Sequence, residues 1–248
     1  MNTEKRVRYH LLDGIRGIVL LSMIAYHFSW NMVYMYGAKW SWYRSMGAYI
    51  WQQSICWTFI LLSGFCFSLG KRHWRSGFMV FGSGLLVTAV TLIAMPDNRV
   101  VFGVLTCIGS CILILALAEK MFRKLPYEVG SGVSFFLFLL TKNINVGYLG
   151  LGDFKIVEVP TNWYSNYITT YLGFPFRKFY STDYFSLFPW FFLFLTGFYL
   201  CGMFEKYDLW ERKFMRVDIP VFSFLGKHSL LLYLLHQPII YGLQEIFF

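Results

Sequence analysis

The sequence predicts an all-α fold: a polytopic bundle of about seven transmembrane helices, with one long external loop before the sixth. Hydrophobic residues fill 57% of the 248 positions and charged residues only 14%, which is more apolar surface than one soluble core of this size can bury. Aromatic residues make up 21% of the chain, as expected where Trp and Tyr rings gather at membrane interfaces. We therefore expect a lipid bilayer to surround a single domain formed by residues 1–248.

Seven stretches meet the requirement of roughly 20 mostly apolar residues for a membrane-spanning helix. The first follows a polar, basic N-terminus and has no small-residue cleavage site, so we expect a retained helix rather than a removed signal peptide. Gly70, Pro96 and Pro126 mark the breaks after the second, third and fourth stretches. The expected spans are 12–34, 49–69, 77–95, 100–122, 130–149, 187–204 and 220–246.

Lysine and arginine residues are unevenly distributed between the expected spans. If the spans alternate in direction, one side of the membrane collects four basic clusters, whereas the other side holds only scattered basic residues. Because such clusters accumulate on the cytoplasmic side, we expect a cytoplasmic N-terminus and an external C-terminus in a bacterial plasma membrane. The net charge of +9 then reflects topology and not nucleic-acid binding. The clusters are Lys5-Arg6-Arg8, Lys71-Arg72-Arg75, Lys120-Arg123-Lys124 and Lys206-Arg212-Lys213-Arg216.

Residues 150–186 form the one long segment that is not apolar, and this segment is rich in Tyr, Asn, Thr and Gly. A loop of this length in a compact protein usually has a function, and the expected topology places it on the external face. Two interpretations are open. The segment is either a lid over a substrate site or a partly ordered connector with no role in binding.

The opening span carries its polar residues along one stripe. His27 follows Arg16 by eleven residues, and eleven helical steps return to almost the same face with a rise of about 16 Å. Asp13 and Asn31 fall near the same stripe. Since an ionisable group facing lipid is costly, we expect this stripe to point inward. In the alternative interpretation, Arg16 pairs only with Asp13 at the membrane boundary and His27 is a hydrogen-bonded packing residue.

A second histidine, His236, lies in the last expected span, just before Pro238. With alternating spans, His27 and His236 lie at similar depth in the outer half of the membrane, where two histidines can share a proton network. A single packing histidine is the alternative. The other histidines occur in basic stretches and are expected at the membrane interface: His10, His73 and His228.

Short motifs spread in one order over nearly the whole chain resemble the transmembrane acyltransferase superfamily. Its polysaccharide O-acetyltransferase branch has an arginine, ten residues and then a histidine, which is the spacing of Arg16 and His27. The resemblance is closest to the bacterial relatives of heparan-alpha-glucosaminide N-acetyltransferase. The motifs are LDGIRG at 12–17, MIAYHF at 23–28, FGVL at 102–105, LGFP at 172–175, STDYFSLFPW at 181–190, LGKHSL at 225–230 and YLLHQP at 233–238.

The resemblance implies transfer of an acetyl group from cytoplasmic acetyl-CoA to an amine or hydroxyl of a sugar at the far face. In this interpretation His27 deprotonates the acceptor, and Asn31 or His236 polarises its ring. A covalent acetyl-histidine is left open. Arg16 and its neighbour Asp13 are expected among the catalytic residues, and Arg16 is also expected to bind the CoA phosphates together with Lys71 and Arg72. Asn31 is also expected to contact the substrate. Residues that could grip the sugar at the external mouth are Asp183, Tyr184 and Trp190.

Two other classes of protein remain alternatives. A small transporter or proton-coupled channel would use Arg16, His27 and His236 as a permeation path, but the sequence shows no inverted repeat and no pair of Gly/Pro-broken helices. A membrane scaffold would leave the polar stripe without a purpose. No metal is expected, because the cysteines lie in apolar runs without histidines at ligand spacing. A homo-oligomer is left open.

Overall fold

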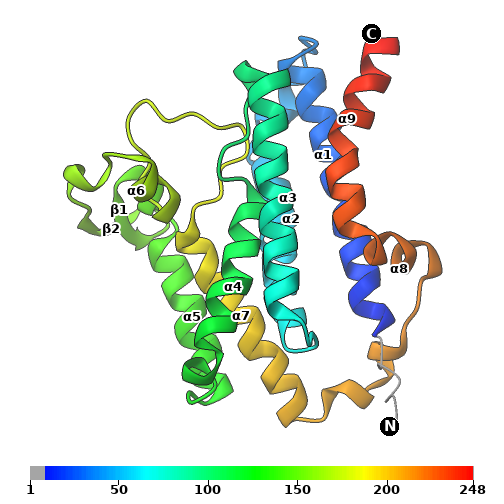
Figure 1. The fold of residues 1–248 in the computed structure, drawn as a ribbon, viewed down its shortest axis with the longest axis vertical. Coiled ribbons are helices and arrows are strands. Elements are labelled where there is room, and N and C mark those ends of the chain that lie inside the picture. The colour runs from blue at the N-terminus through cyan, green and yellow to red at the C-terminus, as the bar shows by residue number, and fades with distance from the viewer. Residues whose placement is uncertain (1–8, 248) are drawn as a thin grey trace. The chain divides into compact units, whose positions relative to one another are not determined.

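The computed structural model describes residues 9–247, so the basic cluster Lys5-Arg6-Arg8 lies outside the described part of the chain. Most of the described residues lie in helices (Figure 1). They divide into two compact units: the chain up to Phe59 together with the chain from Glu205 onward, and Ile60–Phe204. One domain over residues 1–248 stays a prediction. The α-helices are α1 His10–Tyr34, α2 Met46–Phe67, α3 His73–Ala94, α4 Val104–Phe122, α5 Tyr127–Thr141, α6 Tyr167–Leu172, α7 Leu187–Lys206, α8 Pro220–Lys227 and α9 Ser229–Phe247.

Within the described residues, six helices are long and apolar enough to cross a membrane. These are α1 to α4, α7, and α5 extended to Val146 by a short 3-10 turn. They confirm the polytopic all-α class and match the first six expected spans to within a few residues. The hydropathy signal is strong here because each stretch is apolar on most of its faces.

The single span expected over 220–246 is instead two helices, which is a correction. The eight-residue α8 ends at Lys227, and α9 begins at Ser229. α9 is 19 residues long and contains Pro238, and several polar side chains lower its apolar content, so it is not among the six helices found in the described part. Three of the polar side chains of α9 contact α1, namely His236, Gln237 and Gln244.

The segment 150–186 is an ordered connection with secondary structure of its own. β1 (Tyr148–Leu151) and β2 (Phe154–Glu158) form an antiparallel hairpin, and Gly152 in its turn has a φ of +59°. α6 begins with a capping box, in which the Asn166 side chain accepts from the backbone of Thr169. The connector is therefore folded, and its role as a lid stays a prediction.

In the unit formed by the two ends of the chain, α8 packs on the first part of α1 and α9 runs beside the second part (Figure 1). Glycines allow the approach of α8. A Cβ at Gly17 would lie 2.1 Å from the Phe222 carbonyl oxygen, and one at Gly226 would lie 1.9 Å from that of Asp13. The backbones of α1 and α8 are thus in direct contact at two points, an arrangement that small residues permit in membrane helices.

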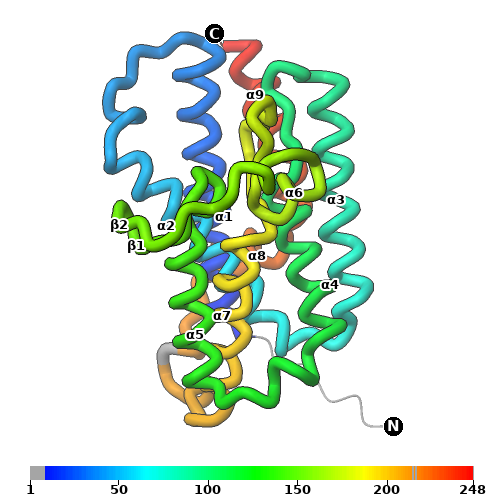
Figure 2. The backbone as a smooth tube through the Cα atoms, turned by 90° about the vertical axis from the view of Figure 1, so that its left-hand side faces the viewer, coloured from blue at the N-terminus to red at the C-terminus, as the bar shows by residue number. Residues whose placement is uncertain are grey.

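In the unit formed by Ile60–Phe204, helices are also in backbone contact at glycine residues. α3 and α4 run side by side (Figure 2), and a Cβ at Gly109 would lie 2.5 Å from the Phe81 backbone nitrogen. Where α2 crosses α7, a Cβ at Gly64 would lie 1.8 Å from the Phe194 carbonyl oxygen, and one at Gly197 would lie 2.0 Å from that of Leu61. Backbone contact at these crossings fixes the spacing of the helices.

Gly64→Ala is expected to destabilise this unit by about 1–3 kcal/mol, because backbone atoms, unlike a side chain, cannot move aside by a rotamer change. The measurement is the midpoint of thermal unfolding of the purified protein in detergent. Gly132→Ala on α5 is the matched control, since a Cβ there meets no atom within 4 Å. Equal midpoints for the two variants would contradict the tight crossing of α2 and α7.

Candidate active site

The candidate active site is a group of polar side chains between α1 and α9, which we call the α1–α9 polar cluster. α1 contributes His27 and Asn31, which are one helical turn apart. α9 contributes His236, Gln237 and Gln244, which lie on one face because seven or eight residues make about two turns. All five belong to the same compact unit.

The two histidines of the cluster face each other. The centroids of the His27 and His236 rings are 5.0 Å apart. Gln237 Nε2 lies 3.1 Å from His27 Nδ1, and His236 Nδ1 is hydrogen-bonded to the Tyr233 carbonyl oxygen. The structure thus brings together the two histidines that the sequence analysis singled out, which are about 200 residues apart in the chain.

Three amide side chains continue the cluster along the helices. Asn31 Nδ2 donates to Gln244 Oε1 at 2.8 Å and to Gln237 Oε1 at 3.4 Å. Gln244 Nε2 donates to the Phe28 carbonyl oxygen at 3.3 Å. Asn31 is 2% exposed and Gln244 is 1% exposed, so these amides depend on one another for hydrogen bonds.

Gln237 and Gln244 were not predicted as site residues from the sequence. A signal was present, because Gln237 adjoins His236 and Gln244 follows two turns later on the same face of an otherwise apolar segment. Polar residues repeated at this spacing in a membrane helix indicate a polar face turned toward protein.

Arg16 and Asp13 lie at the other end of α1. Arg16 Nη1 is 3.7 Å from Asp13 Oδ1, and the Asp13 residue is buried. Because eleven residues of α-helix separate Arg16 from His27, about 16 Å of helix axis lies between them. The ion pair therefore does not take part in the α1–α9 polar cluster, and it is consistent with both interpretations of Arg16.

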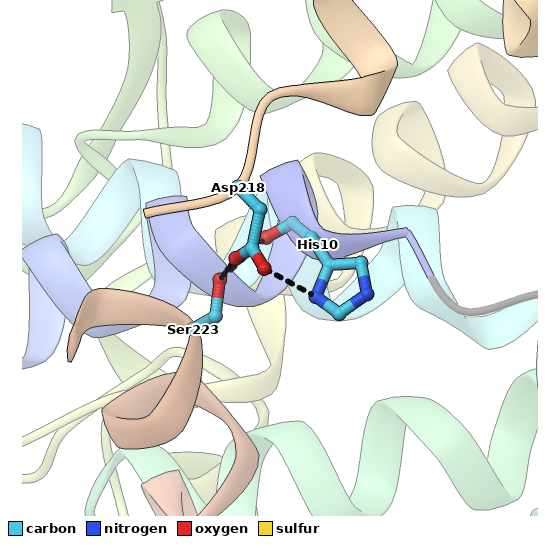
Figure 3. A network of polar contacts seen from close by, with 3 residues as sticks. All are labelled: His10, Asp218 and Ser223. Atoms are coloured by element: carbon cyan, nitrogen blue, oxygen red, sulfur yellow. Dashed lines mark hydrogen bonds and ion pairs between the residues drawn. The ribbon is translucent and has the colours of Figure 1, made fainter. Parts of the chain in front are cut away.

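Near this end of α1, His10 belongs to a network that the sequence analysis did not anticipate (Figure 3). Asp218 Oδ2 lies 3.3 Å from His10 Nδ1, and Asp218 Oδ1 lies 2.6 Å from Ser223 Oγ. The carboxylate stands between the histidine and the hydroxyl (Figure 3), so the serine has no contact with the imidazole that would activate it as a nucleophile. Ser223 Oγ is also 3.2 Å from the His10 carbonyl oxygen. The network joins the start of α1 to the start of α8.

The three residues expected to grip the sugar at the external mouth lie in the other unit and make internal contacts. Asp183 Oδ2 accepts from the Val104 backbone nitrogen at 3.3 Å, at the N-terminus of α4. The Tyr184 hydroxyl donates to the Thr170 carbonyl oxygen, and burial raises the pKa of Tyr184 above its usual range. Trp190 is buried, with its ring centroid 5.6 Å from that of Phe138. These contacts stabilise the unit, and sugar binding by these residues stays a prediction.

The remaining expected ligands of the cofactor, Lys71 and Arg72, are exposed in the connection between α2 and α3. Their exposure leaves both side chains accessible to an anion. Among residues 9–247, no group of three or more His, Cys, Asp or Glu side chains is arranged to hold a metal ion.

Comparison with known protein families adds an independent observation. The profile described as heparan-alpha-glucosaminide N-acetyltransferase, catalytic, matches residues 8–238, which includes α1, α8 and the first half of α9. No curated protein and no solved structure matched the chain. The match covers most of the chain and contains both histidines of the α1–α9 polar cluster. Six helices among the described residues could span a membrane. The chain therefore belongs to the heparan-alpha-glucosaminide N-acetyltransferase catalytic family and is a multi-pass membrane acetyltransferase of the glycan or amino-sugar type.

Proposed function

We propose that this protein transfers the acetyl group of cytoplasmic acetyl-CoA to an amine or hydroxyl of an amino sugar or glycan on the opposite side of a bacterial plasma membrane. The N-terminus would be cytoplasmic, as the distribution of basic residues indicates, and an external C-terminus further requires α9 to cross the membrane as a seventh span. The observation that carries the proposal is the pair of facing histidines in the α1–α9 polar cluster of a chain from an acetyltransferase family.

His27 and His236 would handle the proton that the acceptor loses. Acetyl transfer removes one proton from the attacking amine or hydroxyl, and imidazole is the side chain best suited to take it near neutral pH. Asn31 supports this role through its hydrogen bonds, because it fixes the side chain of Gln237 next to His27. The buried, mutually bonded amides keep the histidines in one geometry.

Arg16 would bind a phosphate group of CoA. Its guanidinium is partly exposed and pairs at 3.7 Å with Asp13, a separation longer than a tight charge-assisted hydrogen bond. Asp13 would orient this side chain. Two further assignments rest on the sequence pattern. Lys71 and Arg72 would bind the anionic groups of CoA, and the sugar would be bound by Asp183, Tyr184 and Trp190.

The test uses the purified protein in lipid vesicles, with acetyl-CoA labelled in its acetyl group outside and an oligosaccharide ending in glucosamine inside. Label is expected in the oligosaccharide. The same oligosaccharide with its terminal amine already acetylated is the matched control, because label in both would identify a hydroxyl as the acceptor. If acetyl-CoA is neither consumed nor transferred, the proposal fails, and sugar uptake without acetylation would favour a transporter.

Arg16→Gln is expected to raise the KM for acetyl-CoA roughly tenfold or more, because a charge-assisted hydrogen bond contributes about 1.5–3 kcal/mol. Steady-state kinetics at saturating acceptor measures the effect, and Arg16→Lys should recover part of the loss. Arg44→Gln is the matched control, since Arg44 is an exposed arginine of the same unit, in the connection between α1 and α2. An unchanged KM in Arg16→Gln would exclude Arg16 from cofactor binding.

A further inference from the structure

Two backbone carbonyl groups fix the direction of every hydrogen bond in the α1–α9 polar cluster. A carbonyl oxygen can only accept, so the side-chain nitrogen that it contacts must carry a hydrogen. The carbonyl oxygen of Phe28 contacts Gln244, and that of Tyr233 contacts His236. These two carbonyl groups determine which nitrogen of each histidine carries a hydrogen.

The Phe28 carbonyl group determines which ring nitrogen of His27 carries the hydrogen. Gln244 turns its amide nitrogen to the Phe28 carbonyl oxygen, and so its Oε1 accepts from Asn31 at 2.8 Å. The second hydrogen of Asn31 Nδ2 is donated to Gln237 Oε1 at 3.4 Å, which turns Gln237 Nε2 toward His27. Gln237 Nε2 has hydrogens only, so His27 Nδ1 must accept with its lone pair. Neutral His27 therefore carries its hydrogen on Nε2.

The Tyr233 carbonyl group determines the tautomer of His236, which is the opposite of that of His27. His236 Nδ1 must donate to the Tyr233 carbonyl oxygen, so neutral His236 has its lone pair on Nε2. This Nε2 is buried, and it has no hydrogen-bond partner among the side chains and backbone groups that the structure describes. A buried, unpaired lone pair on imidazole is costly in a structural residue and is what a general base requires.

We infer that the two histidines divide the chemistry between them: His236 Nε2 is the general base, and His27 Nε2–H is the hydrogen-bond donor to the carbonyl oxygen of the thioester. This assignment rests on the proposed function and specifies it. It reverses the role that the sequence suggested for His27. Gln237 is then a positioning residue, because it acts only through the ring of His27.

The assignment gives a balanced reaction. The acceptor nitrogen or oxygen forms a bond to the thioester carbonyl carbon and loses its proton to His236 Nε2, while the carbonyl π electrons move to the oxygen that His27 Nε2–H stabilises. The carbonyl bond then re-forms and the carbon–sulfur bond breaks. The leaving sulfur takes the proton from His236, which yields CoA thiol, the acetylated acceptor and two neutral histidines.

Nitrogen-15 NMR of histidine-labelled protein in nanodiscs tests the tautomers directly, because protonated and unprotonated ring nitrogens have separate chemical shifts. Signals are assigned by their loss in His27→Gln and His236→Gln. The expected result is a hydrogen on Nε2 of His27 and on Nδ1 of His236. The opposite tautomer at either ring would overturn the inference, whether or not the protein transfers acetyl groups.

Kinetics tests the division of roles. His236→Gln replaces the basic lone pair with an amide and is expected to lower kcat about 10²–10⁴-fold, with loss of the acidic limb of the pH–rate profile. His27→Gln keeps an N–H donor and is expected to lose far less. His228→Gln is the matched control, because His228 is exposed in the same unit. The inference is overturned if His27→Gln lowers kcat more than His236→Gln does. A wild-type protein that transfers no acetyl group would instead reject the proposed function itself.

Gln237→Glu tests the positioning residue. A carboxylate has no hydrogen to donate, so His27 Nδ1 must become the donor and must gain a hydrogen. The expected readout is a protonated His27 Nδ1 in the nitrogen-15 spectrum and a lower kcat. Gln53→Glu makes the same change on α2, where the partner at 3.0 Å is Trp57 and no histidine is involved. An unprotonated His27 Nδ1 in Gln237→Glu would show that Gln237 does not set the tautomer.

Discussion

Replacing His27 with alanine is expected to lower the kcat of acetyl transfer about 10²–10³-fold, the usual loss when a donor to a developing oxyanion is removed. The variant loses the ring that accepts from Gln237 and faces His236 with 5.0 Å between ring centroids. The measurement is kcat with acetyl-CoA and acceptor both saturating, so that weaker binding of either substrate does not contribute.

The control for His27→Ala is His228→Ala, which removes an imidazole from an exposed position of the same unit. Circular dichroism and gel filtration in detergent establish that each variant is folded. A folded His27→Ala protein with the turnover of the wild type would exclude His27 from the reaction. The membrane fold would be unaffected by that result, since it depends on the apolar spans.

Gly17→Ala is expected to destabilise the unit formed by the two ends of the chain by about 1–3 kcal/mol, with a correspondingly lower midpoint of thermal unfolding. A Cβ on residue 17 would lie 2.1 Å from the Phe222 carbonyl oxygen and 2.8 Å from its carbonyl carbon. Both are backbone atoms, so the methyl group fits only if α8 moves away from α1.

The matched control for this prediction is Gly14→Ala, one turn earlier on the same helix, where the nearest atom to a Cβ is Ser223 Oγ at 3.9 Å. Both variants gain the same helix propensity, so the difference between their midpoints reports the contact with α8 alone. Gly226→Ala should behave like Gly17→Ala. Equal stabilities of Gly14→Ala and Gly17→Ala would contradict the docking of α8 on α1.

The sequence by itself determined the helical membrane class and the positions of the first six spans. Hydropathy is a sum over neighbouring residues, so it can be read from the sequence alone. In lipid each backbone N–H and C=O group must be hydrogen-bonded within the protein, and an apolar stretch of this length meets that requirement as an α-helix. It also identified His27 and His236, because an ionisable residue in such a stretch needs a functional or structural reason.

Only the tertiary structure decided what these residues meet. Three features depend on contacts between distant parts of the chain: the break between α8 and α9, the network of Asp218 with His10, and the position of the Gln237 and Gln244 amides beside α1. His27 and Gln237, for example, are 210 residues apart. No local pattern encodes such pairs. The direction of a hydrogen bond, and with it the protonated nitrogen of each histidine, is set by the partner and not by the residue, so it could be read only after the helices were placed side by side.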